Sequence, residues 1–271
     1  MVLFNILAAF GAGALAASIG AVNAFIMTGI LAIVAGVLTC LGLDAGFTAA
    51  VAFATVMGPH MSFAAGAAAT AYAKKKGYID NGCALGQGLT YLGKADVLVV
   101  GGVFGIIAYL IADFVVAKIF GGLIPFGTDN PGMTVVISGI IARLAFTDNG
   151  VKSKNPTFMS KGDALVALLV RAGALSLMAG GTGVALNAAG FSLAGYNLIL
   201  FGIAAVTLLF PGMDQKTAEN MLYATLTNTF LPHGMIGLVL ASMFANTMTM
   251  CNSCTTPIMW LFYCQMHQVN N

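Results

Sequence analysis

Two of the three histidines in the chain follow a proline, and each pair lies part-way along an unusually long apolar stretch. The pairs are Gly58-Pro59-His60, within 45–73, and Leu231-Pro232-His233, within 219–250. Proline removes a backbone donor and clashes with the carbonyl four residues earlier, so we expect both helices to break there. An imidazole at such a break donates and accepts hydrogen bonds and titrates near neutral pH. It can bind an anion, ligate a metal, relay a proton, or only cap its own helix.

Small polar side chains flank both pairs. Thr225, Asn228 and Thr229 share one face of a helix because they are three and four positions apart. Such groups can coordinate Na⁺ or bind a polar substrate, although hydrogen bonding between helices is an ordinary alternative. The predicted substrate- or ion-binding set is Gly58, Pro59, His60, Ser62, Thr225, Asn228, Thr229, Pro232 and His233, with Asn23, Asn197 and Arg171 added.

Ionisable residues inside the apolar stretches are few, and burying them in a membrane is costly. They are Asp113, Arg143 and Arg171, of which Arg143 is expected to reach the headgroups. No carboxylate is near either Pro-His pair in the sequence. We therefore expect coordination by hydroxyls and carbonyls, with Na⁺ as a possible coupling ion, or an anionic substrate held by helix N-termini.

The composition is that of a membrane protein. Of 271 residues, 59% are hydrophobic and 7% charged, which is too apolar for a soluble surface and for a disordered chain. The net charge of +2, with no basic run longer than Lys74 to Lys76, gives no footprint for nucleic acid. Hydrolase, kinase and dehydrogenase signatures are absent from the sequence, so no enzyme is predicted.

Eight apolar stretches predict an all-α, polytopic integral membrane protein with about eight embedded helical segments. They are 3–20, 22–43, 45–73, 96–121, 133–146, 163–189, 195–213 and 219–250. The first lacks a basic leader and is expected to be a retained helix. Lysines fall in the loops after 45–73 and 133–146, so these loops are assigned to the cytoplasm and both termini to the outside of the cytoplasmic membrane.

An internal repeat links the two Pro-His pairs. Shifting the chain by 173 residues aligns Gly29-Ile30 with Gly202-Ile203 and Pro59-His60 with Pro232-His233. On the charge-based topology the two copies run in opposite directions, which is typical of secondary transporters with a broken helix in each half. We predict one transmembrane domain, 1–271, with inverted repeats 3–73 and 175–250 linked by 74–174. Accidental similarity between two Pro-kinked helices is the alternative.

The function predicted from these features is alternating-access transport of a small polar or anionic solute, or an ion, through a site between the two breaks. The partners expected are the lipid bilayer, the solute and, through glycine-rich helix faces, further copies of the chain or a membrane complex. Two other functions fit the same sequence: a structural or anchor subunit that transports nothing, and an uncoupled channel.

A second chemistry is suggested by the cysteines near the end of the sequence. Cys251 and Cys254 are followed by Cys264 and His267, and three thiolates with an imidazole can bind zinc. Neighbouring methionines would suit Cu(I). The spacer is apolar, unlike that of a zinc ribbon, and Cys251 could instead form a disulfide with Cys254. Zinc or copper binding is therefore a secondary prediction.

Overall fold

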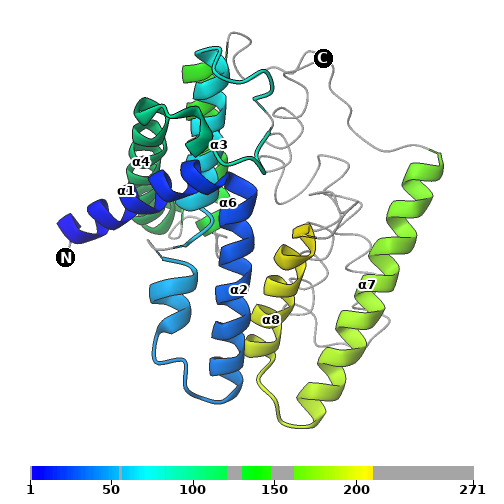
Figure 1. Cartoon of the computed structure of the whole chain (residues 1–271). Helices are drawn as coiled ribbons and strands as arrows, with labels where there is room; N and C mark the ends of the chain where they lie inside the picture. Colours follow the sequence, from blue (N-terminus) through cyan, green and yellow to red (C-terminus); the bar gives the residue numbers. More distant parts are fainter. Residues whose placement is uncertain (1, 55–56, 83, 121–129, 148–161, 210–271) are drawn as a thin grey trace. The chain divides into compact units, whose positions relative to one another are not determined.

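The computed structural model describes residues 2–54, 57–82, 84–120, 130–147 and 162–209 (Figure 1). Within these ranges the regular structure is helical, and no strand occurs. The chain divides into two compact units. Unit 1 consists of Met1–Phe25, Phe53–Pro156 and Ile258–Asn271, and unit 2 of Ile26–Ala52 and Thr157–Pro257.

The described helices follow the predicted apolar stretches. Unit 1 holds α1 (Val2–Ile19), α3 (Ser62–Lys75), the 3-10 turn η2 (Thr90–Leu92), α4 (Ala95–Leu110), its π-helical continuation η3 (Ile111–Phe120) and α6 (Asn130–Phe146). Unit 2 holds most of α2 (Ala21–Cys40), the π-helical turn η1 (Thr48–Ala52), α7 (Asp163–Ala188), α8 (Leu193–Val206) and the turn η4 (Thr207–Leu209).

Three of the described helices are long and apolar enough to cross a membrane, as expected for an integral membrane protein. They are Val2–Ile19, Ala21–Cys40 and the continuous Ala95–Ile119. The stretch 45–73 is interrupted: η1 ends at Ala52 and α3 begins only at Ser62. The predicted helix at 219–250 lies outside the described residues.

Glycine brings α1 and α4 of unit 1 into backbone contact. A Cβ on Gly13 would lie 2.2 Å from the carbonyl oxygen of Gly101, and one on Gly105 would lie 2.1 Å from that of Ala9. Ala9 precedes Gly13 in α1, whereas its partner Gly105 follows Gly101 in α4. The two helices are therefore antiparallel. On both helices, small residues four positions apart allow this approach, which is how many membrane helices associate.

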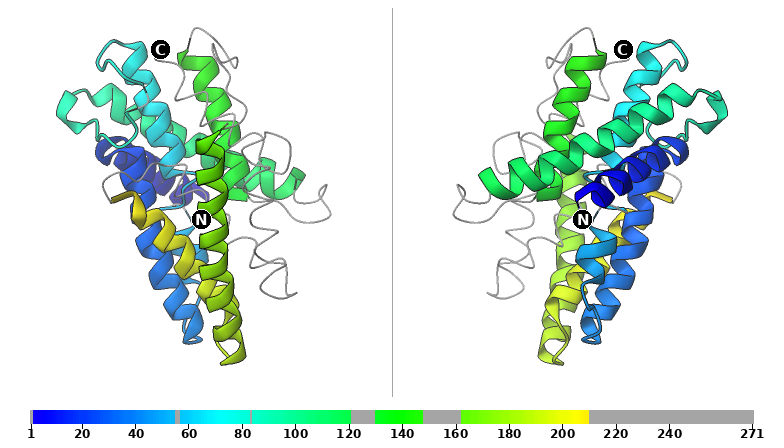
Figure 2. Two further views of the ribbon diagram at one scale, coloured as in Figure 1. Left: turned by 90° about the vertical axis from the view of Figure 1, so that its right-hand side faces the viewer. Right: turned by 90° about the vertical axis from the view of Figure 1, so that its left-hand side faces the viewer.

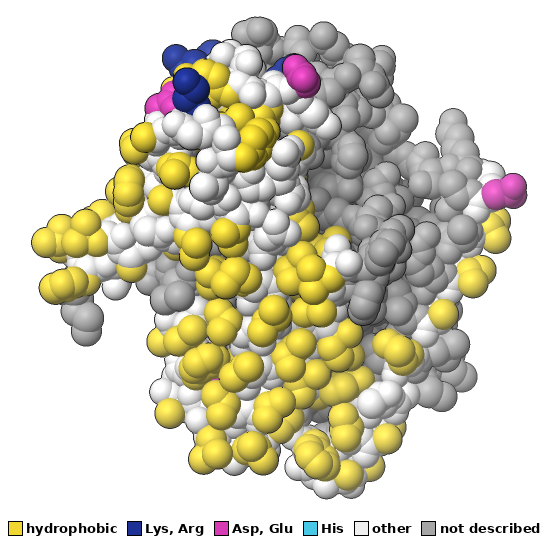
Figure 3. All heavy atoms as spheres, in the orientation of Figure 1, with side chains coloured by type: hydrophobic (Ala, Val, Ile, Leu, Met, Phe, Trp, Pro, Cys, Tyr) yellow, Lys and Arg dark blue, Asp and Glu magenta, His cyan; other side chains and the backbone are white. Residues whose placement is uncertain are grey.

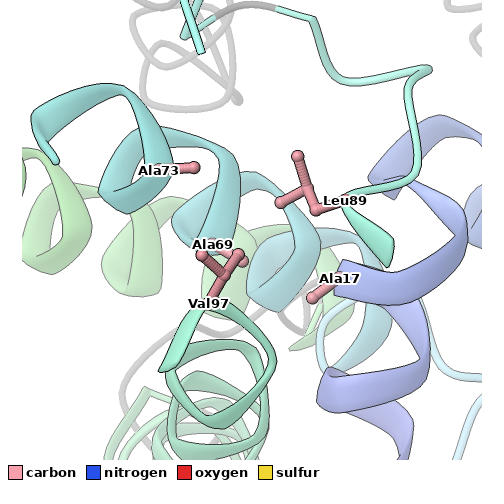
Figure 4. Packing of buried hydrophobic residues seen from close by; sticks show 5 residues of the cluster. All are labelled: Ala17, Ala69, Ala73, Leu89 and Val97. Carbon is pink, nitrogen blue, oxygen red and sulfur yellow. The ribbon is translucent and has the colours of Figure 1, made fainter. Parts of the chain in front are cut away.

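Alanine fills most of the core that these helices share with α3. Ala17, Ala69 and Ala73 pack with Leu89 and Val97, all at most 1% exposed (Figure 4). Small side chains at helix crossings shorten the distance between axes, and the larger Leu89 comes from the loop before η2. The Leu89 amide donates to the Ala17 carbonyl at 3.0 Å, which fastens this loop to the end of α1.

In unit 2, α2 and α8 pack side by side in the same manner (Figures 1 and 2). A Cβ on Gly36 would lie 2.5 Å from the Gly195 oxygen, and one on Gly202 would lie 2.3 Å from the Gly29 oxygen. From one contact to the other, the residue number falls by seven along α2, from Gly36 to Gly29, and rises by seven along α8, from Gly195 to Gly202. The helices are therefore antiparallel with two backbone contacts, two turns apart.

Three helices end in the same hydrogen-bonded turn. Gly42, Gly77 and Gly190 have φ of +71°, +72° and +84°, which only glycine adopts without strain. Each glycine amide bonds back three residues and the next amide bonds back five, as in Tyr78 to Ala73 at 2.9 Å. This Schellman arrangement satisfies the last carbonyls of α2, α3 and α7.

Candidate functional site

The helix interruption before α3 is the core of the candidate site. The Gly58 amide donates to the Ala54 carbonyl at 2.8 Å, and the Gly58 carbonyl accepts from the Met61 and Ser62 amides at 2.9 Å each. The Ser62 hydroxyl adds bonds to the Gly58 and Met57 carbonyls at 3.1 and 3.4 Å. Ser62 therefore closes the break that Pro59 imposes, and its oxygen is engaged in doing so.

His60 is left inside this break with one nitrogen free. Its side chain is 5% exposed, and Nδ1 has no hydrogen-bond partner among the described residues. The ring folds back over Gly58, where a Cβ would lie 2.6 Å from Cε1, so only glycine fits beneath it. A buried, unpartnered polar atom costs about 1–3 kcal/mol. Such an atom calls for a water molecule, an ion or a ligand to complete its bonding.

Helices α1 and α4 form one wall around the break. Met61 packs against Ala9, Ala108 and Tyr109, and all four are buried. The Tyr109 hydroxyl accepts a hydrogen bond from the Asn5 side-chain amide at 3.3 Å. The Asn5–Tyr109 pair therefore lies at the level of the break, on the two helices beside it.

Asp113 corrects one sequence-based expectation. It follows Tyr109 by about one turn, in η3, and its charge acts on His60 from a distant part of the sequence. The sequence had indicated no carboxylate near a Pro-His pair, because Asp113 and His60 are far apart along the chain. The side chain of Asp113 is exposed, whereas that of His60 is buried.

Helix α6 brings a second unpartnered atom to the same level. It runs parallel to α3: the Tyr72 and Phe146 rings are 5.4 Å apart, and Ala142 packs with Ala65 and Ala68. Ser138, one turn before Ala142, therefore lies level with the start of α3. Ser138 is 1% exposed, and its Oγ has no hydrogen-bond partner among the described residues.

Ser138 was missed in the sequence because a single serine beside glycine in an apolar helix is typical of ordinary packing. Its companion Thr134, fully buried, donates to the Asn130 side-chain oxygen at 3.1 Å. Ser138 differs from Thr134 in having no hydrogen-bond partner among the described residues, and this difference depends on how α6 packs.

The remaining predicted site residues fall elsewhere or outside the described ranges. The Asn23 amide donates to the Ile19 and Gly86 carbonyls at 2.6 and 3.0 Å, so it ties the start of α2 to a loop of unit 1. Asn197 is in α8 and Arg171 in α7, both in unit 2. The predicted residues beyond 209 lie outside the described residues: Thr225, Asn228, Thr229, Pro232, His233, Cys251, Cys254, Cys264 and His267.

Comparison with known proteins adds a family. A family model described as a family of unknown function (DUF7973) matches residues 1–158. The chain belongs to this family. The DUF7973 region includes the interruption at Gly58-Pro59-His60 together with Asp113 and Ser138, so the whole described site lies within it. Neither the curated proteins nor the solved structures gave a match to the chain.

Proposed function

We propose that this protein moves a small polar or anionic solute, or an ion, across the cytoplasmic membrane by alternating access. The observation that carries the proposal is a pair of buried atoms level with a helix break, His60 Nδ1 and Ser138 Oγ, which have no hydrogen-bond partner in the part of the chain that the structure describes. Irregular backbone at membrane depth is tolerated where it lines a cavity or is enclosed by protein. A bound solute with hydrogen-bonding groups would supply the partner that each atom lacks.

The chemistry of the site limits what the solute can be. A neutral imidazole offers a donor and an acceptor, and a serine hydroxyl offers both, so the pair suits a small molecule bearing oxygen atoms or an ion. Asp113, whose side chain is exposed and whose charge acts on His60, would favour a cation such as Na⁺ entering with the solute.

The register between α2 and α8 supports an inverted repeat. Gly29 contacts Gly202, and these are the residues that the 173-residue shift makes equivalent. A two-fold axis in the membrane plane produces such a contact, because it sets two equivalent helices antiparallel with one residue facing its own copy. The repeat shift came from sequence and the contact from packing, so their agreement at Gly29 is independent support. On this repeat, Pro232-His233 is the counterpart of Pro59-His60.

The test is uptake by the full-length protein in proteoliposomes. The probes are radiolabelled sodium, phosphate, sulfate and acetate, with and without a pH or sodium gradient. We expect saturable, gradient-dependent uptake of one probe. His60→Gln and Ser138→Ala should each lower it roughly tenfold, since one hydrogen bond to a bound solute contributes about 1–2 kcal/mol. Ser18→Ala is the matched control, because that hydroxyl bonds only its own helix at the Ala14 carbonyl.

Each other outcome would reject the proposal. Folded wild-type protein that moves no probe faster than empty liposomes would favour a structural subunit. Flux that does not saturate and ignores both gradients would favour a channel. Uptake that survives both His60→Gln and Ser138→Ala would remove this site from the pathway.

A further inference from the structure

Four lysines gather at the end of unit 1 where α3 stops and α4 starts (Figure 3). Lys74, Lys75 and Lys76 end α3, and Lys94 precedes α4; all four are exposed. Two carboxylates, Asp80 and Asp96, belong to the same region. The end therefore carries a net positive charge beside the apolar helices.

Two of the lysines are committed to the fold. The Lys74 ammonium donates to the Asp80 carbonyl at 2.5 Å, and that of Lys75 donates to the Ala145 carbonyl at 2.7 Å. The second bond satisfies a carbonyl at the end of α6 and fixes α6 beside α3. Their charges remain, but their donors are partly used.

The other two lysines have no acceptor among the described residues. The Lys76 nitrogen lies 5.6 Å from the centre of the Tyr72 ring, and that of Lys94 lies 5.3 Å from the centre of the Tyr78 ring. Cation–π contacts of this kind orient an ammonium without using its N–H groups in hydrogen bonds. Both heads are held in place and can still donate.

One carboxylate holds the two rings together. The Tyr72 and Tyr78 hydroxyls both donate to Oδ2 of Asp96, at 3.1 and 3.2 Å. Burial raises the pKa of the Tyr78 hydroxyl, and its bond to Asp96 raises it further, so the phenol keeps its proton. Lys76 and Lys94 therefore lie over two rings that a single carboxylate links.

Apolar side chains are exposed on two helices that these lysines precede or contact. Val99, in α4 after Lys94, is 50% exposed, and Leu144, next to the Ala145 carbonyl that Lys75 binds, is 60% exposed. An occupant that satisfies both surfaces needs an anionic head and a hydrocarbon tail. Soluble phosphate would use the ammoniums only.

We propose that Lys76 and Lys94 bind the phosphate of an anionic phospholipid, with its acyl chains against Val99 and Leu144. Lysines at a membrane surface each attract anionic lipid, and here aromatic rings and Asp96 arrange two of them in advance. This inference does not depend on the proposed transport function.

The test is lipid retention by the full-length protein, measured by native mass spectrometry. Protein equilibrated with equal phosphatidylglycerol and phosphatidylcholine should retain the anionic lipid preferentially. In K76Q/K94Q this preference should fall by roughly tenfold to thirtyfold, since each lysine near an anionic surface contributes a factor of about five. Lys118→Gln is the matched control, because that exposed lysine lies over Phe114, 4.4 Å from its ring centre, in η3.

Two further arms complete the experiment. K76R/K94R should keep the preference, which separates loss of charge from loss of packing. Millimolar inorganic phosphate should not displace the lipid. Equal retention of both lipids by the wild type, an undiminished preference in K76Q/K94Q, or displacement by phosphate would overturn the proposal.

Discussion

Two serines of unit 1 show how similar residues can serve stability or function. Ser62 bonds two carbonyls at the helix interruption, whereas Ser138 has no hydrogen-bond partner among the described residues. Both are at most 1% exposed. A buried hydroxyl with partners stabilises the fold, and one without partners destabilises it.

The two serines should therefore respond differently to alanine. Ser62→Ala should lower the free energy of unfolding by about 1 kcal/mol, because the hydroxyl's hydrogen bonds to two carbonyls at the break are lost. Ser138→Ala should leave stability unchanged or raise it, while lowering uptake. The first effect is measured by thermal denaturation in detergent, with a thiol-reactive dye that reports cysteines as they become exposed. Equal destabilisation by both variants would mean that Ser138 has a partner in the folded protein.

Contacts between the helices depend on glycine, because its lack of a side chain lets two backbones approach. In α1, Gly13 lies against the Gly101 backbone, whereas a Cβ at Gly11, two residues earlier, would meet nothing within 4 Å. The same helix thus contains a glycine that packing requires and one that it does not.

Gly13→Ala should destabilise unit 1 by about 1–3 kcal/mol, because α1 and α4 must separate to admit a methyl group. Gly11→Ala is the control and should be neutral or stabilising by up to about 1 kcal/mol, as alanine favours helix. Comparing their melting temperatures in one detergent decides the matter. A Gly13→Ala protein as stable as Gly11→Ala would contradict the close crossing.

The antiparallel register of α2 and α8 can be tested by cross-linking. The Cys40 sulfur lies 3.9 Å from the Ser192 carbonyl oxygen, so Ser192→Cys should form a disulfide with Cys40 under mild oxidation. The other four cysteines are replaced by serine, and protection from maleimide labelling gives the readout. Moving the thiol one position, in Cys40→Ser with Thr39→Cys, turns it about 100° around α2 and should abolish the reaction.

At the scale of the whole molecule, the distribution of lysine is the basis of the proposed orientation of the chain in the membrane. Described lysines occur at the end of α3, before α4 and in η3, and none in α2 or in the loop after it. The proposed topology assigns the α3–α4 loop to the cytoplasm and the loop after α2 to the outside.

Single cysteines introduced into a cysteine-free chain should report this orientation in intact cells. Leu43→Cys, in the loop after α2, should react with a maleimide that cannot cross the membrane. Asp80→Cys, in the α3–α4 loop, should react only after the cells are opened. Both positions are accessible to reagent, since Leu43 is 63% exposed and Asp80 is exposed. The reverse labelling pattern would invert the topology.

Local chemistry was predictable from sequence, and long-range chemistry was not. Pro59 indicated the helix interruption because its effect on the backbone is confined to one turn. Asp113 was notable in the sequence as an ionisable residue in an apolar stretch, but its relation to His60 depends on how α4 and η3 pack. Ser138 comes to the level of the break only through the packing of α6 against α3, and no pattern in α6 distinguishes it. The second Pro-His pair stays a prediction.

The crossing of α1 and α4 also has a consequence for biosynthesis. About 75 residues separate the end of α1 from the start of α4, so a ribosome working at roughly 5–20 residues per second needs several seconds to make the partner. Throughout that interval the glycine-bearing face of α1 would lack its partner. If lipid covered this face, assembly of the pair would replace lipid by backbone. Insertion machinery that shields α1 during those seconds would set the yield of folded protein.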